Sequence, residues 1–349
     1  MAGWCLNLLY ALLLIAAAPW IAWRAWFTGR YREAWRAKLL GHAPHRTSLG
    51  PCVWIHAVSV GEVNLVATII RHLRDERPNV TIFLSTTTKT GYDLAQKKYA
   101  GCTVFYAPLD FTWAVATALD RVRPDLLILA ELEIWPNWIA AAQARDIPIA
   151  VINGRLSARS FRGYRRLRWL LRPSFARLSI VAVQNEEYAA RFLDLGAKPT
   201  AVHVTGSVKF DGARTDRGNA QTQQLAELAG ITPDDIVFLA GSTQEPEEVA
   251  AIETYCFVSA VHPRLRLIIV PRHPERFESV AKLLDQLGVA WQRRSQLSST
   301  SAQPDARILL VDTIGELGAW WGTAAIGFVG GSLGSRGGQN MIEPAAYGA

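Results

Sequence analysis

Cysteine is scarce in this sequence, and the few cysteines form no recognisable site. Cys5, Cys52, Cys102 and Cys256 are far apart along the 349 residues. No pair has the spacing of a zinc site or of a redox-active dithiol, so a reduced compartment fits. Half of the residues are hydrophobic, which excludes wholesale disorder and is enough for two α/β domains with ordinary cores.

Charged side chains are missing from the first 23 residues. Positions 6–23 are nearly all apolar, and about 20 such residues span a bilayer as a helix. Aromatic residues lie near the two ends of this run, as an interfacial belt requires: Trp4, Tyr10, Trp20, Trp23 and Trp26. We therefore expect residues 1–26 to form a single-pass membrane anchor. A buried helix of a soluble protein and a cleaved signal peptide are the alternatives, in that order.

Basic residues follow this apolar run directly: Arg24, Arg30, Arg32, Arg36 and Lys38. The positive-inside rule then places the rest of the chain in the cytoplasm. A signal peptide fits less well, because its positive charges would precede the apolar run. We expect residues 27–50 to be a basic, irregular segment next to the membrane.

Acidic residues are missing from positions 155–177, which hold eight arginines: Arg155, Arg159, Arg162, Arg165, Arg166, Arg168, Arg172 and Arg177. The chain as a whole carries a net charge of +7, which favours an acidic partner. A solvated basic face is the usual meaning of such a run, and aromatic residues between the arginines can also mark nucleic-acid binding. Next to an anchor, anionic headgroups or a phosphorylated lipid are favoured over nucleic acid.

Apolar runs alternate with helix-like segments along the chain, which predicts doubly wound parallel sheets. The expected strands are 53–58, 80–85, 126–130, 149–152, 180–183, 237–240, 265–270, 308–311 and 325–330. The polar stretch 211–223 is the expected linker between an N-terminal domain at 51–210 and a C-terminal domain at 224–349. We expect the second domain to be incomplete, because it has fewer strands than the first.

Two glycine-punctuated stretches, HAVSVGE at 56–62 and GGSLGSRGGQNMIEP at 330–344, lie between strand-like and helix-like runs. Ligands bind at such places in open α/β sheets. The second stretch is neither a P-loop nor a dinucleotide motif, yet its five glycines would let backbone N–H groups approach a phosphate. Two such half-sites are the expected layout of a transferase with a donor and an acceptor.

Several polar residues at predicted strand ends could carry chemistry. Glu62 could be a general base or simply an acid favoured by the helix dipole. Glu131 and Glu133 could meet a substrate hydroxyl, cap a helix or pair with arginines, and Lys209 could offset developing negative charge or be solvated. Arg272 follows a strand and a proline, a geometry that suits phosphate binding, and Glu343 could accept from ribose hydroxyls.

Six motifs in order resemble the 3-deoxy-D-manno-octulosonic acid (Kdo) transferases of lipid A biosynthesis over nearly the whole chain. They are HAVSVGE, ELEIWPN at 131–137, NGRLS at 153–157, GSVKFD at 206–211, PRHPER at 271–276 and the stretch 330–343. The resemblance implies a GT-B fold with two Rossmann-like domains facing a cleft, and an inverting transfer of Kdo from CMP-Kdo to the lipid A precursor without a metal or other cofactor. It also implies a bacterial inner-membrane protein with its catalytic domains on the cytoplasmic face.

The resemblance also implies roles for particular residues. Glu62 matches the proton acceptor, and Glu131 and Lys209 match the residues that stabilise the transition state. The expected CMP contacts are Pro271, Arg272, Ile314, Gly315, Glu316, Asn340, Met341, Ile342 and Glu343. The family continues beyond the last of these motifs, so the chain is expected to be C-terminally truncated.

This chain departs from the family pattern at three positions: Gln244 and Gln339 stand where many members have His, and Pro246 where Gly is common. The alternative functions are another GT-B protein, such as a different lipid glycosyltransferase or an epimerase, and a membrane-tethered nucleotide-binding protein without catalysis. The anchor and the segment 56–62 argue against a soluble epimerase, and a protein that only bound a nucleotide would need no base at Glu62.

Overall fold

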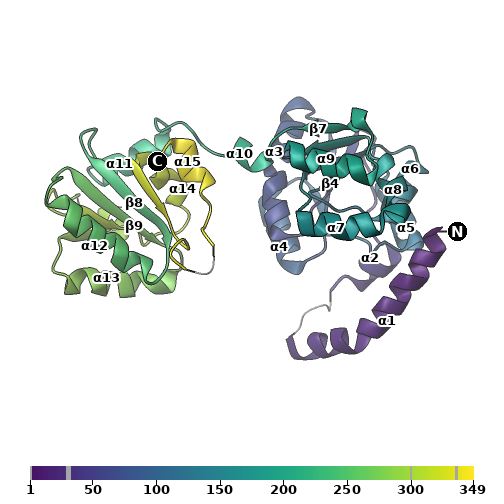
Figure 1. The fold of residues 1–349 in the computed structure, drawn as a ribbon, viewed down its shortest axis with the longest axis horizontal. Helices are drawn as coiled ribbons and strands as arrows, with labels where there is room; N and C mark the ends of the chain where they lie inside the picture. Colours follow the sequence, from purple (N-terminus) through teal and green to yellow (C-terminus); the bar gives the residue numbers. More distant parts are fainter. Residues whose placement is uncertain (1, 29–32, 299–300, 335–336) are drawn as a thin grey trace. The chain divides into compact units, whose positions relative to one another are not determined.

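The computed structural model describes residues 2–28, 33–298, 301–334 and 337–349. The chain forms two compact units, Met1–Asp211 and Gly212–Ala349, coloured purple to teal and green to yellow in Figure 1. Each unit has its own parallel sheet and its own core. The expected α/β class with two doubly wound units is confirmed, and the cleft between them stays a prediction.

The sheet of the first unit has seven strands in the order β3-β2-β1-β4-β5-β6-β7, and every neighbouring pair is parallel. Its strands are β1 (Cys52–His56), β2 (Thr81–Thr86), β3 (Thr103–Tyr106), β4 (Leu126–Ala130), β5 (Ile149–Gly154), β6 (Ile180–Val183) and β7 (Val202–Val204). The order in which strands are added reverses between β1 and β4. Ligands of doubly wound sheets bind at this switch point, outside the carboxyl ends of the strands.

The helices described in the first unit cover both faces of its sheet. They are α1 (Ala2–Thr28), α2 (Trp35–Leu40), α3 (Val60–Glu76), α4 (Lys89–Lys98), α5 (Thr112–Val122), α6 (Pro136–Gln143), α7 (Ala158–Arg166), α8 (Arg168–Ala176), α9 (Glu186–Leu195) and α10 (Val208–Asp211). Trp54 of β1 packs in a core with α5, α6, α8 and α9, whereas its neighbour Ile55 packs in a second core with α3 and α4. A strand buried on both faces reads as a continuous apolar run.

The second unit has five parallel strands in the order β10-β11-β9-β8-β12. They are β8 (Ile236–Thr243), β9 (Leu265–Pro271), β10 (Trp291–Arg293), β11 (Ile308–Leu310) and β12 (Ile326–Val329). The helices described here are α11 (Ala220–Leu228), α12 (Glu247–Ser259), α13 (Phe277–Gln286), α14 (Leu317–Trp320) and α15 (Ile342–Tyr347). Helices α12 and α13 cover one face, and α11, α14 and α15 cover the other. The switch point of this sheet lies between β8 and β12.

Three observed strands, β3, β7 and β10, are not among the strands expected from the sequence. Each lies at the edge of its sheet and has only three or four residues. Strands β7 and β10 contain no fully buried residue. A short edge strand needs no continuous apolar run, so hydrophobic patterning does not reveal it.

Two segments expected to be irregular contain helical turns. Helix α2 lies within residues 27–50, and Trp113 of α5 donates its indole N–H to the carbonyl of Leu39 at 2.8 Å. Helix α11 begins at Ala220, inside the expected linker 211–223, because the Asn219 side chain caps it by accepting from the N–H of Thr222. Polar composition does not exclude a helix at this place, since the N-terminal turn of a helix is itself polar.

Helix α1 is long and apolar enough to cross a membrane, and almost none of the window Gly3–Phe27 is buried. No other described helix meets that test. This finding is compatible with the expected membrane anchor.

Candidate active site

Glu62 lies in the first turn of α3, directly after β1 and at the switch point of the first sheet. Its carboxylate accepts the backbone N–H of Val58 at 2.7 Å on Oε2 and the hydroxyl of Ser59 at 3.0 Å on Oε1. Ser59 in turn caps the helix by accepting from the N–H of Glu62 at 3.4 Å. These bonds hold the carboxylate in one orientation and leave each oxygen with a further lone pair.

The environment of Glu62 shifts its proton affinity toward neutral pH. Burial raises the pKa of the Glu62 carboxyl to about 7, although the hydrogen bonds from Val58 and Ser59 oppose the rise. The nearby carboxylates of Glu133 and Glu131 raise this pKa further. An acid that merely complements a helix dipole would have a lowered pKa, whereas a raised pKa is a property that general bases need.

The loop that carries Glu62 is held by the end of the neighbouring strand β2. The carbonyl oxygen of Val58 accepts from the hydroxyls of Thr86, Thr87 and Thr88 at 3.0, 3.3 and 3.4 Å. A Cβ atom at Gly91 would lie 2.6 Å from the Thr86 hydroxyl oxygen, so a glycine is needed where α4 starts. Adjacent parallel strands therefore fix the position of the carboxylate.

Glu131 and Glu133 follow β4, the strand next to β1 in the sheet. The strand ends at Ala130 and Glu131 has a left-handed φ of 56°, so the strand alternation that would place both side chains on one face does not apply. Burial raises the pKa of Glu133, against the effect of the Trp135 indole, which donates to Oε2 of Glu133 at 2.7 Å. The negative charges of both carboxylates nevertheless raise the pKa of Glu62.

Asn153 at the end of β5 is a positioning residue that residue-level reasoning missed. It is fully buried, has a φ of 52°, and its Oδ1 accepts from the hydroxyl of Ser207 and the N–H of Val208, each at 3.2 Å. These bonds hold the start of α10, which contacts α3 and carries Lys209 with an exposed side chain. The signal in the sequence was an asparagine and a glycine ending a buried apolar run.

His56, which ends β1, is not a candidate acid or base. It is buried, its Nδ1 lies 2.9 Å from the Ser85 hydroxyl, and burial lowers the pKa of His56 to about 4. The same hydroxyl accepts the indole N–H of Trp54 at 2.8 Å. His56 is therefore neutral and belongs to the core.

The arginine-rich segment forms α7 and α8 on the first unit. Seven of its eight arginines are exposed and Arg168 is partly buried. Arg165 and Arg168 each lie 3.9 Å from the carboxylate of Asp194, and no other arginine of this segment has a recorded ion pair within the described residues. Burial and, to a smaller extent, the charge of Glu133 raise the pKa of the Tyr164 hydroxyl in α7. This basic surface therefore adjoins the carboxylate cluster formed by Glu62, Glu131 and Glu133.

The second unit carries a different carboxylate at its own switch point. Glu247, in the first turn of α12, is 3% exposed and accepts the backbone N–H groups of Gln244, Gly331 and Leu333 at 3.0, 2.9 and 3.2 Å. Burial opposes ionisation, yet these N–H groups hold the pKa of Glu247 below its usual range. A Cβ at Gly330 would lie 2.1 Å from the carbonyl oxygen of Ser242, so only glycine allows this approach of β12 to β8.

A cavity of about 380 Å³ lies beside this glycine loop; its lining is Gln244, Glu245, Pro246, Glu247, His273, Arg276, Gly331 and Gly334. Arg272 follows β9 and is next to His273 of this lining. The backbone N–H of Arg272 donates to the carbonyl of Thr243 at 3.0 Å. Its side chain is exposed, whereas Pro271 is buried. The basic residue is therefore available to an anion at this edge.

Gly315 and Glu343 line a second cavity of about 180 Å³ in the same unit, together with Gly212, Arg214, Gln221, Gly318, Ala319 and Tyr347. Glu316 does not line it. Its carboxylate accepts from Arg294 at 2.8 and 2.9 Å and from the Thr313 hydroxyl at 2.7 Å, so it fixes the turn instead of facing a ligand. The backbone of this turn reaches the cavity at Gly315, which has a φ of 89°.

The remaining predicted CMP contacts lie around that cavity without lining it. Ile314 is 81% exposed and Met341 is 68% exposed. Asn340 accepts from the N–H of Ile342 at 3.1 Å and so orders the start of α15. Among the residues that the structure describes, no group of three or more His, Cys, Asp or Glu side chains is arranged to hold a metal ion.

Comparison with known proteins shows the family of this chain. A family model described as 3-deoxy-D-manno-octulosonic-acid transferase matches residues 33–212. The transferase of that name from Haemophilus influenzae is 34% identical over 322 residues, covering 91% of this chain and 74% of that protein. The Bordetella pertussis transferase is 35% identical over 354 residues, covering 97% and 81%. The solved C-terminal CMP-Kdo binding domain of WaaA from Acinetobacter baumannii is 34% identical, covers 37% of this chain and 67% of that domain, and has a TM-score of 0.34.

Proposed function

Because the chain belongs to the Kdo transferase family, we propose that it moves Kdo from CMP-Kdo to the lipid A precursor, lipid IVA, in lipopolysaccharide biosynthesis. The observation that carries this proposal is Glu62, a half-buried carboxylate with a pKa of about 7 at the switch point of the unit that the family model covers. A protein that only bound a nucleotide would not need this group.

In the proposed reaction, Glu62 takes the proton of an acceptor hydroxyl as the hydroxyl oxygen bonds to the anomeric carbon of Kdo. The bond from that carbon to the phosphate oxygen breaks, and its electron pair leaves with CMP. Attack from the face opposite to CMP inverts the anomeric configuration. A base with a pKa near the working pH is efficient, because a large fraction of it is ionised and it still has a high proton affinity.

Charged residues around Glu62 would stabilise the transition state. The carboxylate of Glu131 would favour the positive charge that develops on the sugar ring, and Lys209 would favour the negative charge on the departing phosphate. Helix α10, which carries Lys209, contacts α3, which carries Glu62. With Lys209 and Arg272 as cations, we propose that the reaction needs no metal.

We propose that the second unit binds CMP. Arg272 would bind the phosphate, the backbone of the Gly315 turn would contact the nucleoside, and Glu343 would accept from ribose hydroxyls. Gly315 and Glu343 share one cavity, which supports this assignment. Ile314, Glu316, Asn340, Met341 and Ile342 would shape the turn and the start of α15.

We propose that the first unit binds the lipid acceptor and contacts the membrane. The arginines of α7 and α8 suit lipid phosphates and anionic headgroups, and nucleic acid is not an expected partner. The apolar α1 would hold the protein at the bacterial inner membrane as its single N-terminal anchor, with both units on the cytoplasmic face.

The test is transfer by the full chain from CMP-Kdo to lipid IVA, with Glu62→Gln and Asp75→Asn compared to the wild type. Asp75 lies at the far end of α3 and is exposed, so it controls for charge loss on the same helix. Product formed by wild type and Asp75→Asn but not by Glu62→Gln supports the proposal. Absence of product with the folded wild type contradicts it.

A further inference from the structure

The first turns of α1 are seated on the first unit by buried polar contacts. Asn7 is 4% exposed; its Nδ2 donates to the Thr112 hydroxyl at 2.7 Å, and its Oδ1 accepts from the N–H of Thr112 at 3.1 Å and from Nδ2 of Asn137 at 3.4 Å. The Tyr10 hydroxyl donates to the carboxylate of Asp110 at 3.1 Å. An apolar helix that merely spanned lipid would have no use for this asparagine.

Asp110 joins α1 to the start of α6. Besides Tyr10, its carboxylate accepts the backbone N–H groups of Asn137 and Trp138 at 3.2 and 2.9 Å. Gly3 permits the close approach, because a Cβ there would lie 3.0 Å from Oδ1 of Asn137. The contact is therefore built from several residues on both sides, and α1 belongs to the fold of the first unit.

This seating divides α1 into two faces. Gly3, Asn7 and Tyr10 face the unit, whereas Trp4, Leu8, Leu12 and Ile15 follow at helical spacing and are each more than half exposed. If α1 crossed the bilayer with its N-terminus on the far side, Asn7 and Tyr10 would be carried away from Thr112 and Asp110. The contacts favour a helix whose first turns lie against the unit and whose exposed face is turned toward lipid.

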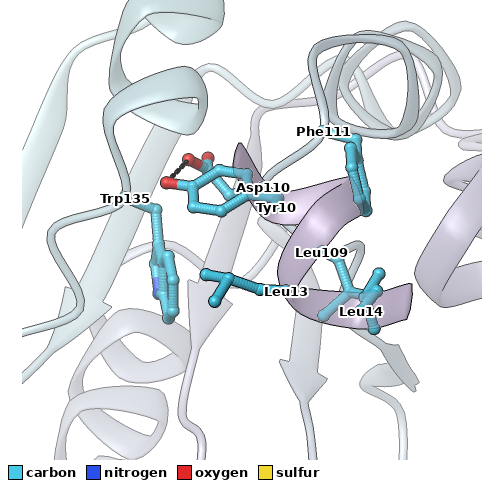
Figure 2. A pocket seen from close by; sticks show the side chains of 7 residues that line it. All are labelled: Tyr10, Leu13, Leu14, Leu109, Asp110, Phe111 and Trp135. Atoms are coloured by element: carbon cyan, nitrogen blue, oxygen red, sulfur yellow. Dashed lines mark hydrogen bonds between the residues drawn. The ribbon is translucent and has the colours of Figure 1, made fainter. Parts of the chain in front are cut away.

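An apolar pocket of about 240 Å³ opens between α1 and the unit, as Figure 2 shows; its lining is Tyr10, Leu13, Leu14, Leu109, Asp110, Phe111 and Trp135. The Tyr10 hydroxyl and the Asp110 carboxylate are hydrogen-bonded to each other. Three of the seven lining residues come from α1. Without the seated helix this pocket would have no wall on that side.

Trp135 connects this pocket to the carboxylate cluster. Its ring lines the pocket, and its indole N–H donates to Glu133 at 2.7 Å. Glu133 acts in turn on the proton affinity of Glu62. Trp135 and Glu133 thus link this apolar pocket, which opens beside α1, to the proposed base.

We propose that this pocket binds an acyl chain of the lipid acceptor and that α1 is a wall of the acceptor site as well as an anchor. The inference rests on the proposed function, because it assigns the pocket to that reaction's acceptor. An amphiphile whose sugar hydroxyl lies at Glu62 and whose phosphates meet the arginines of α7 has its acyl chains beside the membrane.

The test compares Leu13→Trp, which fills the pocket, with Leu12→Trp, whose side chain is equally exposed but does not line it. Both variants are assayed as full chains with lipid IVA and with its deacylated disaccharide, and their membrane binding is measured by flotation. We expect Leu13→Trp to raise the KM for lipid IVA about tenfold, equivalent to about 1.4 kcal/mol of binding, with no change for the deacylated acceptor or for CMP-Kdo. Leu12→Trp should match the wild type.

A second measurement does not depend on turnover. Lipid IVA with a diazirine in one acyl chain should crosslink to residues 109–111 or to Trp135 in the wild type and in Leu12→Trp, and much less in Leu13→Trp. Crosslinks elsewhere, or equal KM changes for both acceptors, would overturn the pocket assignment while transfer by the wild type left the proposed function standing. Equal crosslinking of a diazirine phospholipid that lipid IVA fails to displace would show a bilayer lipid in the pocket and also overturn it. A wild type that transfers to neither acceptor would instead contradict the proposed function.

Discussion

The two sheets place a glutamate at the same topological position and give it opposite protonation behaviour. Glu62 begins the helix after β1, and Glu247 begins the helix after β8. Glu62 accepts one backbone N–H and one hydroxyl, and its pKa rises to about 7. Glu247 accepts three backbone N–H groups and has a lowered pKa. Burial raises the pKa of both carboxyls: at Glu62 it outweighs the two hydrogen bonds and like-charged neighbours add to it, whereas at Glu247 the backbone N–H donors outweigh it.

This contrast shows how one position in a doubly wound sheet can serve either chemistry or architecture. A carboxylate satisfied by several N–H groups stays ionised and holds a loop in place, as Glu247 holds the loop after β12. A carboxylate with few donors and like-charged neighbours can exchange a proton near neutral pH. Four predictions test this division.

The largest expected effect is on the rate of transfer by Glu62→Gln. Removing a general base typically costs about 10²–10⁴ in rate, and the glutamine keeps the size of the side chain. In the wild type, Glu62 must be ionised to accept a proton, so the rate should rise with pH through about 7. Initial rates between pH 5 and pH 9 check this, with CMP affinity as the control for folding. A variant with near-normal turnover would show that Glu62 is not the base.

The next effect separates the substrates of the two units. Replacing Arg162, Arg165, Arg166 and Arg168 with Gln should raise the KM for lipid IVA about 10- to 100-fold, since each basic residue near an anionic surface contributes about 1 kcal/mol before screening. The matched variant Arg272→Gln should raise the KM for CMP-Kdo instead. Steady-state kinetics with each substrate varied in turn measures both. Equal effects on both substrates in either variant would contradict the division of roles.

A smaller effect is expected on stability when Glu247 becomes Gln. The amide cannot satisfy all of the N–H groups that the carboxylate binds, and hydrogen bonds to charged groups contribute about 1.5–3 kcal/mol. The folded pKa of Glu247 is lowered, so its stabilisation is present above the unfolded value near 4.5 and is lost as the pH falls through the folded value. Denaturant unfolding at pH 7 and pH 4 measures this, with Glu253→Gln on the exposed face of α12 as the control. A variant as stable as the control at pH 7 would make Glu247 dispensable.

The smallest effect has the opposite sign and concerns Glu62. Its folded pKa is raised, so the wild type loses stability relative to Glu62→Gln as the pH rises from about 4.5 through about 7. Glu62→Gln should therefore unfold at a higher temperature than the wild type at pH 8 and at nearly the same temperature at pH 4. Thermal unfolding of both proteins across this range is the measurement. A variant less stable than the wild type at pH 8 would mean that the carboxylate supports the fold, as Glu247 does.

The central strands of both sheets could be predicted because they are buried on both faces and read as apolar runs. The edge strands β3, β7 and β10 could not, because few of their residues need to be apolar. The predicted strand 53–58 ends at His56, since Ser59 caps α3 and Val58 donates to Glu62. The apolar runs that form strands are local features of the sequence. The order of the strands in a sheet depends on pairing between segments that are far apart in the sequence.

The sequence by itself determined the α/β class, the apolar helix and the position of Glu62 after a strand. Only the tertiary structure decided that the pKa of Glu62 is raised to about 7 while that of Glu247 is lowered. It also decided that Glu316 forms an ion pair with Arg294 and that α1 packs on the first unit. Proton affinity and seating depend on groups more than 20 residues away, such as Glu133 for Glu62 and Asp110 for Tyr10. Such contacts cannot be predicted from local sequence patterns.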